Sequence, residues 1–225
     1  MYYDLNVPCE SQPNRIAIDR LKLILSRFSQ LDQTVVALNC CVSEKDLPNV
    51  KPLNEIPFDI VKHPVKQLTR ITIETSSAVS NDTLTQLRST FDLIAVRPST
   101  LNTFEDACYN LNIDIISLDC SVRLPFRVDA HSVQKAIQRG VYFEITYSAG
   151  IRDTTARGYF LQVANILVCA TNGNNLIVSS EAETVADLRA SYDAFYLMKS
   201  LSLPNDKAQF VTGKHCEQLL RKIGH

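Results

Sequence analysis

Glycine is scarce in this chain of 225 residues: it occurs six times, and no two glycines are separated by a single residue. A G-x-G-x-x-G dinucleotide loop and a G-x-x-x-x-G-K-[ST] phosphate loop are therefore both excluded. The G-x-S-x-G turn of the α/β-hydrolases is also missing. The sequence thus lacks the usual signatures of nucleotide-binding enzymes and of serine hydrolases.

The chain also lacks the spacings that metal sites require. Its seven cysteines form no C-x-x-C pair, and its four histidines share no ligand spacing with one another or with cysteine. We therefore predict no zinc site. Most cysteines lie in apolar runs, which predicts reduced core residues of an intracellular protein. For the vicinal pair Cys40-Cys41, a redox or metal pair remains an alternative to a simple strand end.

Long apolar runs and strong net charge are missing as well. No window approaches the roughly 18 continuous apolar residues of a membrane span, and the start of the chain has no basic segment typical of a signal peptide. The formal net charge is −1. These features predict a soluble intracellular domain that does not contact a membrane.

What is present is a series of short β-branched runs, apolar on both faces, each followed by a segment of helical pattern. Strands covered on both faces are typical of parallel sheets. The predicted strands are Tyr2–Val7, Thr34–Asn39, Thr69–Thr75, Phe91–Val96, Ile113–Leu118, Val141–Tyr147 and Asn175–Ser179. The predicted helices are Arg15–Phe28, with Ile16 and Leu23 on its apolar face, Asp82–Ser89, Asp129–Gln138, Asp153–Ala170, Ala182–Ser200, one starting near Asn205, and a last one to Arg221.

Seven βα units in series, without a break in composition, predict one domain over residues 1–225. We expect an α/β fold: an irregular TIM-like (β/α) barrel with seven clear strands, a weak or missing eighth, and extra C-terminal helices. A doubly wound open sheet is the alternative. Residues 43–66 contain four prolines and are expected to form an irregular excursion after the second strand.

Positive charge is concentrated between residues 123 and 157. This segment has six Lys or Arg residues (Arg123, Arg127, Lys135, Arg139, Arg152 and Arg157) against three acids (Asp129, Glu144 and Asp153). A local basic band on a nearly neutral protein predicts an anionic partner. In a barrel, Arg123, Arg127, Arg152 and Arg157 would converge on the carboxyl-terminal face, whereas Arg139 lies at the opposite end of its strand. Solvated surface charge, with ion pairs from Arg152 to Asp153 or Glu144, is the alternative interpretation.

A metal-dependent hydrolase remains a rival hypothesis. Asp4, Asp119 and Glu144 follow or lie within strands, and carboxylates suit a magnesium ion. However, Glu144 lies in the middle of its strand, where a carboxylate inside the barrel and bonded to an arginine is equally natural. We predict a structural, buried role for Asp4, Glu144 and Asp153, and no catalytic residue or metal site on this chain.

Eight short motifs, in order along nearly the whole chain, resemble one family. They are Tyr3-Asp-Leu-Asn-Val-Pro8, Leu68-Thr-Arg-Ile-Thr-Ile73, Phe91–Val96 with Pro98, Leu111-Asn-Ile-Asp114, Arg123-Leu-Pro-Phe126, Arg139–Tyr147, Ile151-Arg-Asp153 with Ala156-Arg157, and Asn175–Ser180. The chain resembles the thirty-kilodalton protein subunit of eukaryotic and archaeal ribonuclease P, which ribonuclease MRP shares. Each motif alone is a weak signal, but their common order and spacing are specific.

The resemblance implies a TIM-like barrel that does not itself cut RNA. It implies a subunit that binds the RNA of ribonuclease P, and of ribonuclease MRP, together with a small RRM-like protein subunit and other proteins of the particle. It further implies removal of the 5′ leader of precursor tRNA, in the nucleus and nucleolus, with magnesium held by the catalytic RNA and no cofactor on this chain. By position, Arg123, Arg139, Arg152 and Arg157 match basic residues of the family, and Asp4, Glu144 and Asp153 match acidic ones.

Two departures from the family pattern affect the basic surface. A second arginine usually follows the position of Arg157, where this chain has Gly158, and a small residue is expected where it has Glu181. Exposed apolar residues of the late helices, such as Phe195, Tyr196 and Phe210, are candidates for a protein interface or for core packing.

Overall fold

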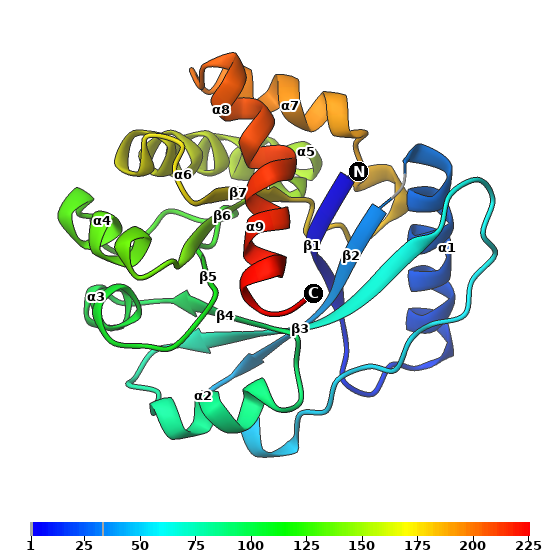
Figure 1. The fold of residues 1–225 in the computed structure, drawn as a ribbon, viewed down its shortest axis with the longest axis horizontal. Helices are drawn as coiled ribbons and strands as arrows, with labels where there is room; N and C mark the ends of the chain where they lie inside the picture. Colours follow the sequence, from blue (N-terminus) through cyan, green and yellow to red (C-terminus); the bar gives the residue numbers. More distant parts are fainter. Residues whose placement is uncertain (1, 33) are drawn as a thin grey trace.

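Seven parallel strands form one sheet in which each strand pairs with the next along the chain. The computed structural model describes residues 2–32 and 34–225, and Figure 1 shows the strands arranged around a central axis. They are β1 (Tyr2–Cys9), β2 (Thr34–Ser43), β3 (Val65–Thr75), β4 (Leu93–Pro98), β5 (Ile115–Ser117), β6 (Tyr142–Thr146) and β7 (Leu176–Ser179). This sequential order confirms the irregular barrel and excludes a doubly wound sheet, whose strand order reverses.

There is no eighth strand between β7 and β1, and among the described residues these two strands do not pair with each other as a β-ladder. The pairing of β1 with β2 shifts register between Asp4 and Val7, which frees backbone groups of β1 for other partners. The Glu181 amide donates to the Asn6 carbonyl at 3.0 Å, and the Ser180 amide donates to the Asp4 carboxylate at 3.1 Å. Two connections thus close the barrel where a strand pair would normally do so.

Helices surround the sheet (Figure 1). They are α1 (Arg15–Leu31), α2 (Asn81–Arg88), α3 (Leu101–Tyr109), α4 (Ala130–Gln138), α5 (Ser148–Arg152), α6 (Thr154–Thr171), α7 (Ser191–Ser200), α8 (Asn205–Gln209) and α9 (His215–Lys222), with short turns η1 (Leu47–Asn49), η2 (Val185–Asp187) and η3 (Phe210–Lys214). Within the described residues, no helix combines the length and the hydropathy needed to cross a bilayer.

Three predictions about these helices were wrong. The buried face of α1 consists of Leu21, Ile24, Leu25, Phe28 and Ser29, so the predicted apolar positions Ile16 and Leu23 face outward. Helix α3 was not predicted at all. The single helix predicted for Ala182–Ser200 is divided into η2 and α7, because the chain between them is extended at Leu188 and Ala190.

The proline-rich connection between β2 and β3 contains no α-helix, as predicted, although the longer strands shorten it to residues 44–64. Its backbone is held by two polar side chains. Ser29 of α1 accepts a hydrogen bond from the Val61 amide at 2.7 Å, and Gln67 makes a pair of bonds with the backbone of Ile56, at 3.0 and 2.9 Å. Ile56 is also buried in the core, with Leu53 and Phe58 packed against the same cluster, so the connection is held to the barrel without a crossover helix.

Helix α9 closes the amino-terminal mouth of the barrel (Figure 1). Its buried residues Cys216, Leu219 and Leu220 pack against the first inward-facing side chains of the strands, including Leu5 and Ile177. Above this apolar layer the interior of the barrel is polar. The C-terminal helix therefore seals one end and leaves the other end, at the carboxyl ends of the strands, available for a site.

The cysteines are all unpaired. Four of the seven are buried as predicted (Cys40, Cys108, Cys120 and Cys216), whereas Cys41 and Cys169 are exposed and Cys9 is partly buried. Cys40 and Cys41 lie inside β2, which extends to Ser43. The Sγ atom of Cys40 lies 3.4 Å from that of Cys9 on the neighbouring strand rather than forming a pair with Cys41.

Candidate functional site

The centre of the barrel contains a buried ion pair between Arg70 of β3 and Glu144 of β6. Both side chains are inaccessible to solvent, and the guanidinium binds the carboxylate in a bidentate manner, at 2.6 and 2.7 Å. Their remaining polar atoms are also satisfied: the Leu5 carbonyl accepts from Arg70 at 2.6 Å, and Ser117 and Asn6 donate to Glu144 at 2.6 and 3.0 Å. Burial opposes ionisation of Glu144, but Arg70 outweighs it and lowers its pKa.

Asp4 is equally buried but binds backbone amides. Its carboxylate accepts from the amides of Asn6 and Ser180, at 3.3 and 3.1 Å. Burial raises the pKa of Asp4 to about 7, because the amide hydrogen bonds offset only part of the lost hydration. The burial predicted for Asp4 and Glu144 is observed, and both carboxylates bind groups of the protein itself.

The three carboxylates of the rival metal hypothesis do not meet. Glu144 is occupied by Arg70, and Asp4 by backbone amides. Asp119 accepts from the amide and the hydroxyl of Ser121, at 2.8 and 2.6 Å. Across residues 2–32 and 34–225 no three His, Cys, Asp or Glu side chains form a group that could hold a metal ion.

The carboxyl-terminal mouth of the barrel is open and carries both signs of charge. A cavity of about 470 Å³ is lined by Glu74, Arg97, Asp119 and Arg123, among others. Arg97 is largely buried there and pairs with Glu181 at 2.5 Å. Burial disfavours the charged form of Arg97, but Glu181 outweighs it and raises the pKa of the guanidinium. The acid that departs from the family pattern is therefore neutralised inside this chain.

Arg123 and Arg127 line a groove beside this mouth. The groove has a volume of about 380 Å³ and lies between the loop that follows β5 and helix α6. Its lining consists of Arg123, Leu124, Pro125, Phe126, Arg127, Gln162, Val163 and Ile166, without an acidic residue. Both arginines are exposed. Within the described part of the chain, neither takes part in a salt bridge or a side-chain hydrogen bond.

The other predicted arginines bind protein groups. Arg139 donates to the backbone carbonyls of Ala107, Cys108 and Leu111, at 3.2, 2.8 and 2.5 Å. It thereby satisfies the carboxyl end of α3, where a positive charge is favourable.

Arg152 pairs with Glu183 at 2.6 Å and with Asp187 at 3.7 Å, rather than with Asp153 or Glu144 as the alternative interpretation proposed. Arg157 is exposed, and its Nε donates to the Gly150 carbonyl at 2.9 Å. The expected convergence of four arginines is thus not observed: Arg123 and Arg127 share a groove that Arg152 and Arg157 do not line.

Asp153 has a structural role, but it is exposed rather than buried. Its carboxylate accepts from the Ala156 amide at 2.7 Å and caps the amino terminus of α6. Tyr142 and Tyr147 are both core residues. All three positions therefore support the fold, and the two buried tyrosines offer no surface to a ligand.

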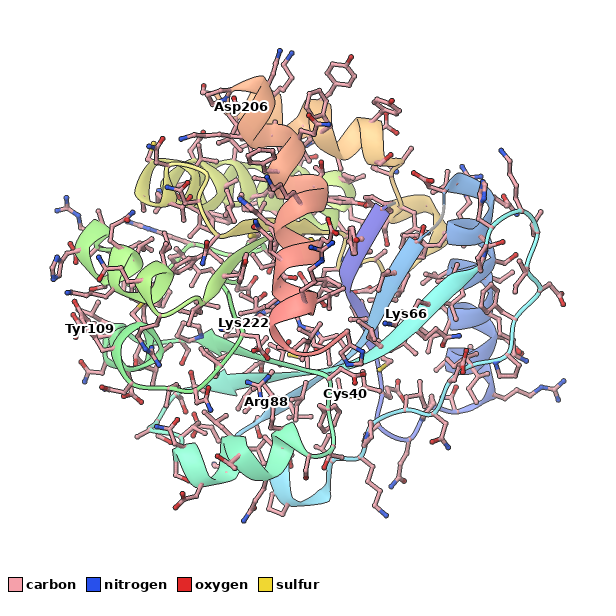
Figure 2. All side chains as sticks on the ribbon, in the orientation of Figure 1. Cys40, Lys66, Arg88, Tyr109, Asp206 and Lys222 are labelled. Atoms are coloured by element: carbon pink, nitrogen blue, oxygen red, sulfur yellow. The ribbon has the colours of Figure 1, made fainter. Side chains whose placement is uncertain are left out.

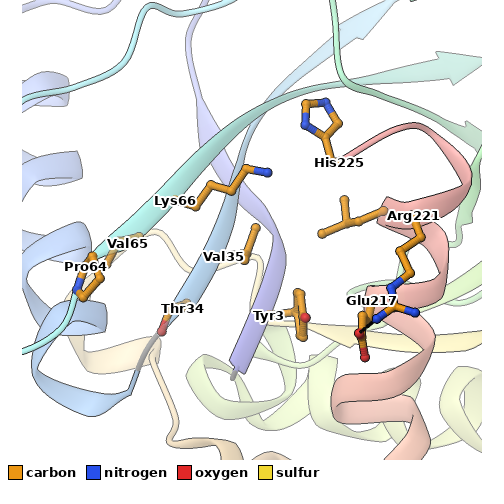
Figure 3. Close-up of a pocket in the computed structure, with 10 residues that line it drawn as sticks. Tyr3, Thr34, Val35, Pro64, Val65, Lys66, Glu217, Arg221 and His225 are labelled. Atoms are coloured by element: carbon orange, nitrogen blue, oxygen red, sulfur yellow. Dashed lines mark hydrogen bonds and ion pairs between the residues drawn. The ribbon is translucent and has the colours of Figure 1, made fainter.

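A second charged region, with both signs of charge, lies at the opposite end of the barrel. A cavity of about 440 Å³ opens between α9 and the first residues of β2 and β3 (Figure 3). Lys66 extends into it, and Arg221 is paired there with Glu217 at 2.5 Å. Figure 2 shows Lys66, Arg88 and Lys222 around the end of α9. The sequence did not reveal that these basic residues lie near one another, because they come from β3, α2 and α9, which are far apart along the chain.

Sequence reasoning also missed Arg70 and Arg97 as members of the polar interior. Each lies on a strand at an inward-facing position, and an arginine within a run of buried β-branched residues was the available signal. An ionised side chain in such a run requires a buried counterion. An arginine partner for Glu144 was one of two interpretations of the sequence, and Arg70 is that partner.

The sequence matches the family described as RNase P subunit p30 over residues 1–225. Over 222 residues it is 31% identical to the "Probable ribonuclease P protein subunit 3" of Schizosaccharomyces pombe, a match that covers 98% of this chain and 92% of that protein. It is 28% identical to the "Ribonuclease P/MRP protein subunit RPP1" of Saccharomyces cerevisiae, over 95% of this chain and 77% of that protein. It is 37% identical to the "Protein GAMETOPHYTE DEFECTIVE 1" of Arabidopsis thaliana, but spans only 28% of that protein.

The fold matches as well. A chain in the cryo-EM structure of archaeal ribonuclease P with mature tRNA superimposes with a TM-score of 0.70, at 14% identity, over 98% of this chain and 90% of that chain. At that identity the likeness concerns the fold alone. Together with the match over the full sequence, it agrees with the motifs and the seven-stranded barrel, and the chain belongs to the RNase P subunit p30 family.

Proposed function

We propose that this chain is a non-catalytic protein subunit of ribonuclease P, in which the RNA performs the cleavage that removes the 5′ leader of precursor tRNA. The observation that carries the proposal is the family match over residues 1–225. The polar interior supports it, since Asp4 and Glu144 are occupied by structural partners. The magnesium ions of the reaction would then be held by the RNA, with no cofactor on this chain.

Arg123, Arg127 and Arg157 are the proposed RNA contacts. All three are exposed, and among the described residues none has a carboxylate partner that a phosphate would have to displace; Arg157 donates only its Nε, to the Gly150 carbonyl. Arg139 and Arg152 are weaker candidates, because their guanidinium groups already bind carbonyls and carboxylates of the protein. Such contacts would position RNA without reading its sequence.

The proposed partners are the RNA of ribonuclease P, the RNA of ribonuclease MRP, a small RRM-like protein subunit and other proteins of the particle. The name of the budding-yeast relative supports membership in both particles. Tyr192 and Tyr196 lie one turn apart on α7 and are 75% and 61% exposed, which favours this helix as the protein-binding surface. The protein would be located in the nucleus. If it also acts in rRNA processing as part of the MRP particle, it would be located in the nucleolus as well.

Reconstitution tests the proposal. The full chain would be combined with ribonuclease P RNA and the other protein subunits of the same organism, and cleavage of a precursor tRNA measured. We expect the double variant R123A/R127A to lower the rate at moderate salt, and R15A, which removes an exposed arginine of α1, to leave it unchanged. Omission of the RNA should abolish cleavage. Hydrolysis of a phosphoester by the purified chain with magnesium alone would instead favour a metal-dependent enzyme.

A further inference from the structure

The loop that follows β5 forms one wall of the groove, and it is held in place at its start, in its middle and at its end. At the start of the loop, the Asp119 carboxylate accepts two hydrogen bonds from Ser121. In its middle, the ring of Phe126 packs against that of Phe104, with 5.3 Å between centroids. At its end, Asp129 caps α4 by accepting from the Ser132 amide at 2.9 Å. The loop is therefore preorganised, and a ligand does not have to fix its conformation on binding.

The charged residues that line the groove are all positive. Arg123 and Arg127 stand on the loop, and Gln162 is the only other polar residue of the lining. Helix α6, which forms the other wall, contains no Asp or Glu from Thr154 to Thr171, and its one charged residue is Arg157. Glu74 and Asp119 line the neighbouring cavity of the carboxyl-terminal mouth, which shares Arg123 with the groove. A polyanion in the groove thus meets positive charge and no carboxylate in the lining itself.

The rest of the lining is apolar. Leu124, Pro125 and Phe126 come from the loop, and Val163 and Ile166 from α6. Val163 is buried, but Leu124, Phe126 and Ile166 are only partly buried and Pro125 is exposed, so a phosphate group alone would leave this apolar surface in water. The aromatic faces of nucleobases suit such walls, and Gln162 has both a donor and an acceptor for the edge of a base.

We infer that this groove binds unpaired RNA, with a nucleobase between the apolar walls and its flanking phosphates on Arg123 and Arg127. In a duplex the faces of the bases are stacked, and A-form RNA offers proteins only a wide, shallow minor groove. A base enters a groove of about 380 Å³ only from a single strand. The inference rests on the proposed RNA contact and specifies the kind of RNA.

Fluorescence anisotropy with the full chain tests this assignment. The probes are a fluorescein-labelled 12-nucleotide oligouridylate, a 12-base-pair RNA duplex, and a 12-unit abasic strand with the same phosphates. We expect the oligouridylate to bind more tightly than the duplex, and the abasic strand to bind about tenfold more weakly than the oligouridylate. R123A/R127A should weaken binding of the oligouridylate and reduce the log–log salt slope by about 1.4. Q162A, at an exposed position, should weaken the oligouridylate but not the abasic strand.

R15A is the matched control, since it removes an exposed arginine remote from the groove. Equal binding of duplex and single strand, or of abasic and normal strand, would overturn the inference while leaving an RNA contact through the arginines intact. If R123A/R127A weakens none of the probes more than R15A does, the RNA contact of the proposed function fails as well. Circular dichroism of each variant would show that the fold is kept.

Discussion

Burying the charged side chains of Arg70 and Glu144 costs free energy of folding, yet removing either one alone would destabilise the folded chain. Removing an ion from water costs several kcal/mol, and the pair recovers this only because nearly every polar atom finds a partner. Loss of one member leaves the other charge buried and uncompensated. The pair is therefore expected to behave as a unit under mutation.

We predict that E144Q lowers the free energy of unfolding by about 3–5 kcal/mol, as measured by urea denaturation. R70M should lower it by a similar amount. The double variant R70M/E144Q should lose clearly less than the sum of the two, because no uncompensated charge remains. Additive losses would mean that the two side chains contribute independently, contrary to their bidentate contact.

Asp4 makes stability depend on pH in the opposite direction from most carboxylates. Its pKa is raised from 3.8 to about 7 in the folded chain, so between these values the folded state binds the proton and the unfolded state has released it. The contribution of Asp4 to the free energy of unfolding is thus full below about pH 4 and falls as the pH rises to about 7. Compared with D4N, the native chain should lose stability over this window. Parallel curves for the two proteins would refute the raised pKa.

Gly158 offers a test of the departure from the family's basic pattern. A Cβ atom at this position would meet no atom within 4 Å, and Gly158 lies in the interior of α6. G158A should therefore stabilise the chain by about 0.5–1 kcal/mol. G158R should add to this a steeper salt dependence of RNA binding, by about 0.7 in the log–log slope if the new guanidinium reaches a phosphate. An unchanged slope in G158R would place this part of α6 away from the RNA.

At the scale of elements, the strands were predictable because each is a short run of β-branched residues. Helix α3 was missed although its buried residues Phe104, Ala107 and Cys108 recur at helical spacing, and it begins with a capping box between Thr100 and Thr103 that could have revealed it. The helix predicted from Ala182 was too long, because residue composition does not show that the backbone is extended at Leu188 and Ala190, between η2 and α7.

The basic surface was predictable as a region but not as a set of residues. Arg139 binds carbonyls that lie 28 to 32 residues earlier in the chain. The acids that pair with Arg152 belong to the segment after β7. Such partners depend on the folded arrangement, so sequence alone could not separate Arg123 and Arg127 from the rest. The Leu-Pro-Phe turn flanked by Arg123 and Arg127 was predicted at the carboxyl-terminal face, but the groove between this turn and α6 was not predicted.

Helix α9 supplies an element-scale prediction. Leu219 is fully buried among the first inward-facing side chains of the strands, so L219A should cost about 2–5 kcal/mol of stability. K222A, near the end of the same helix, removes one contact from the Lys222 ammonium to the Gly140 carbonyl at 2.9 Å and should cost far less. Chemical denaturation of both variants provides the measurement. A similar small loss for both would mean that α9 is not part of the barrel core.

At the scale of the whole molecule, the barrel has one weak seam. Six neighbouring strand pairs are joined by parallel ladders, whereas β1 and β7 are joined by the bonds from Ser180 to Asp4 and from Glu181 to Asn6. An edge with few backbone bonds opens locally at lower free energy than a central strand. Unfolding should therefore begin by separation of β1 from β7, with the centre of the sheet opening last.

Amide hydrogen exchange can test this order. D4A removes the side-chain acceptor of the Ser180 amide, and we expect exchange to become faster at Ser180 and along β1 and β7, with a smaller change in β3 and β4. T72A is the matched control, because it truncates a buried polar side chain of β3 that donates to Asn39 at 2.8 Å. It should affect the centre of the sheet but leave the seam no more exposed than the overall loss of stability requires. A uniform acceleration across all seven strands in D4A would show that the barrel opens as one cooperative unit and that the Asp4 contact does not set a separate boundary.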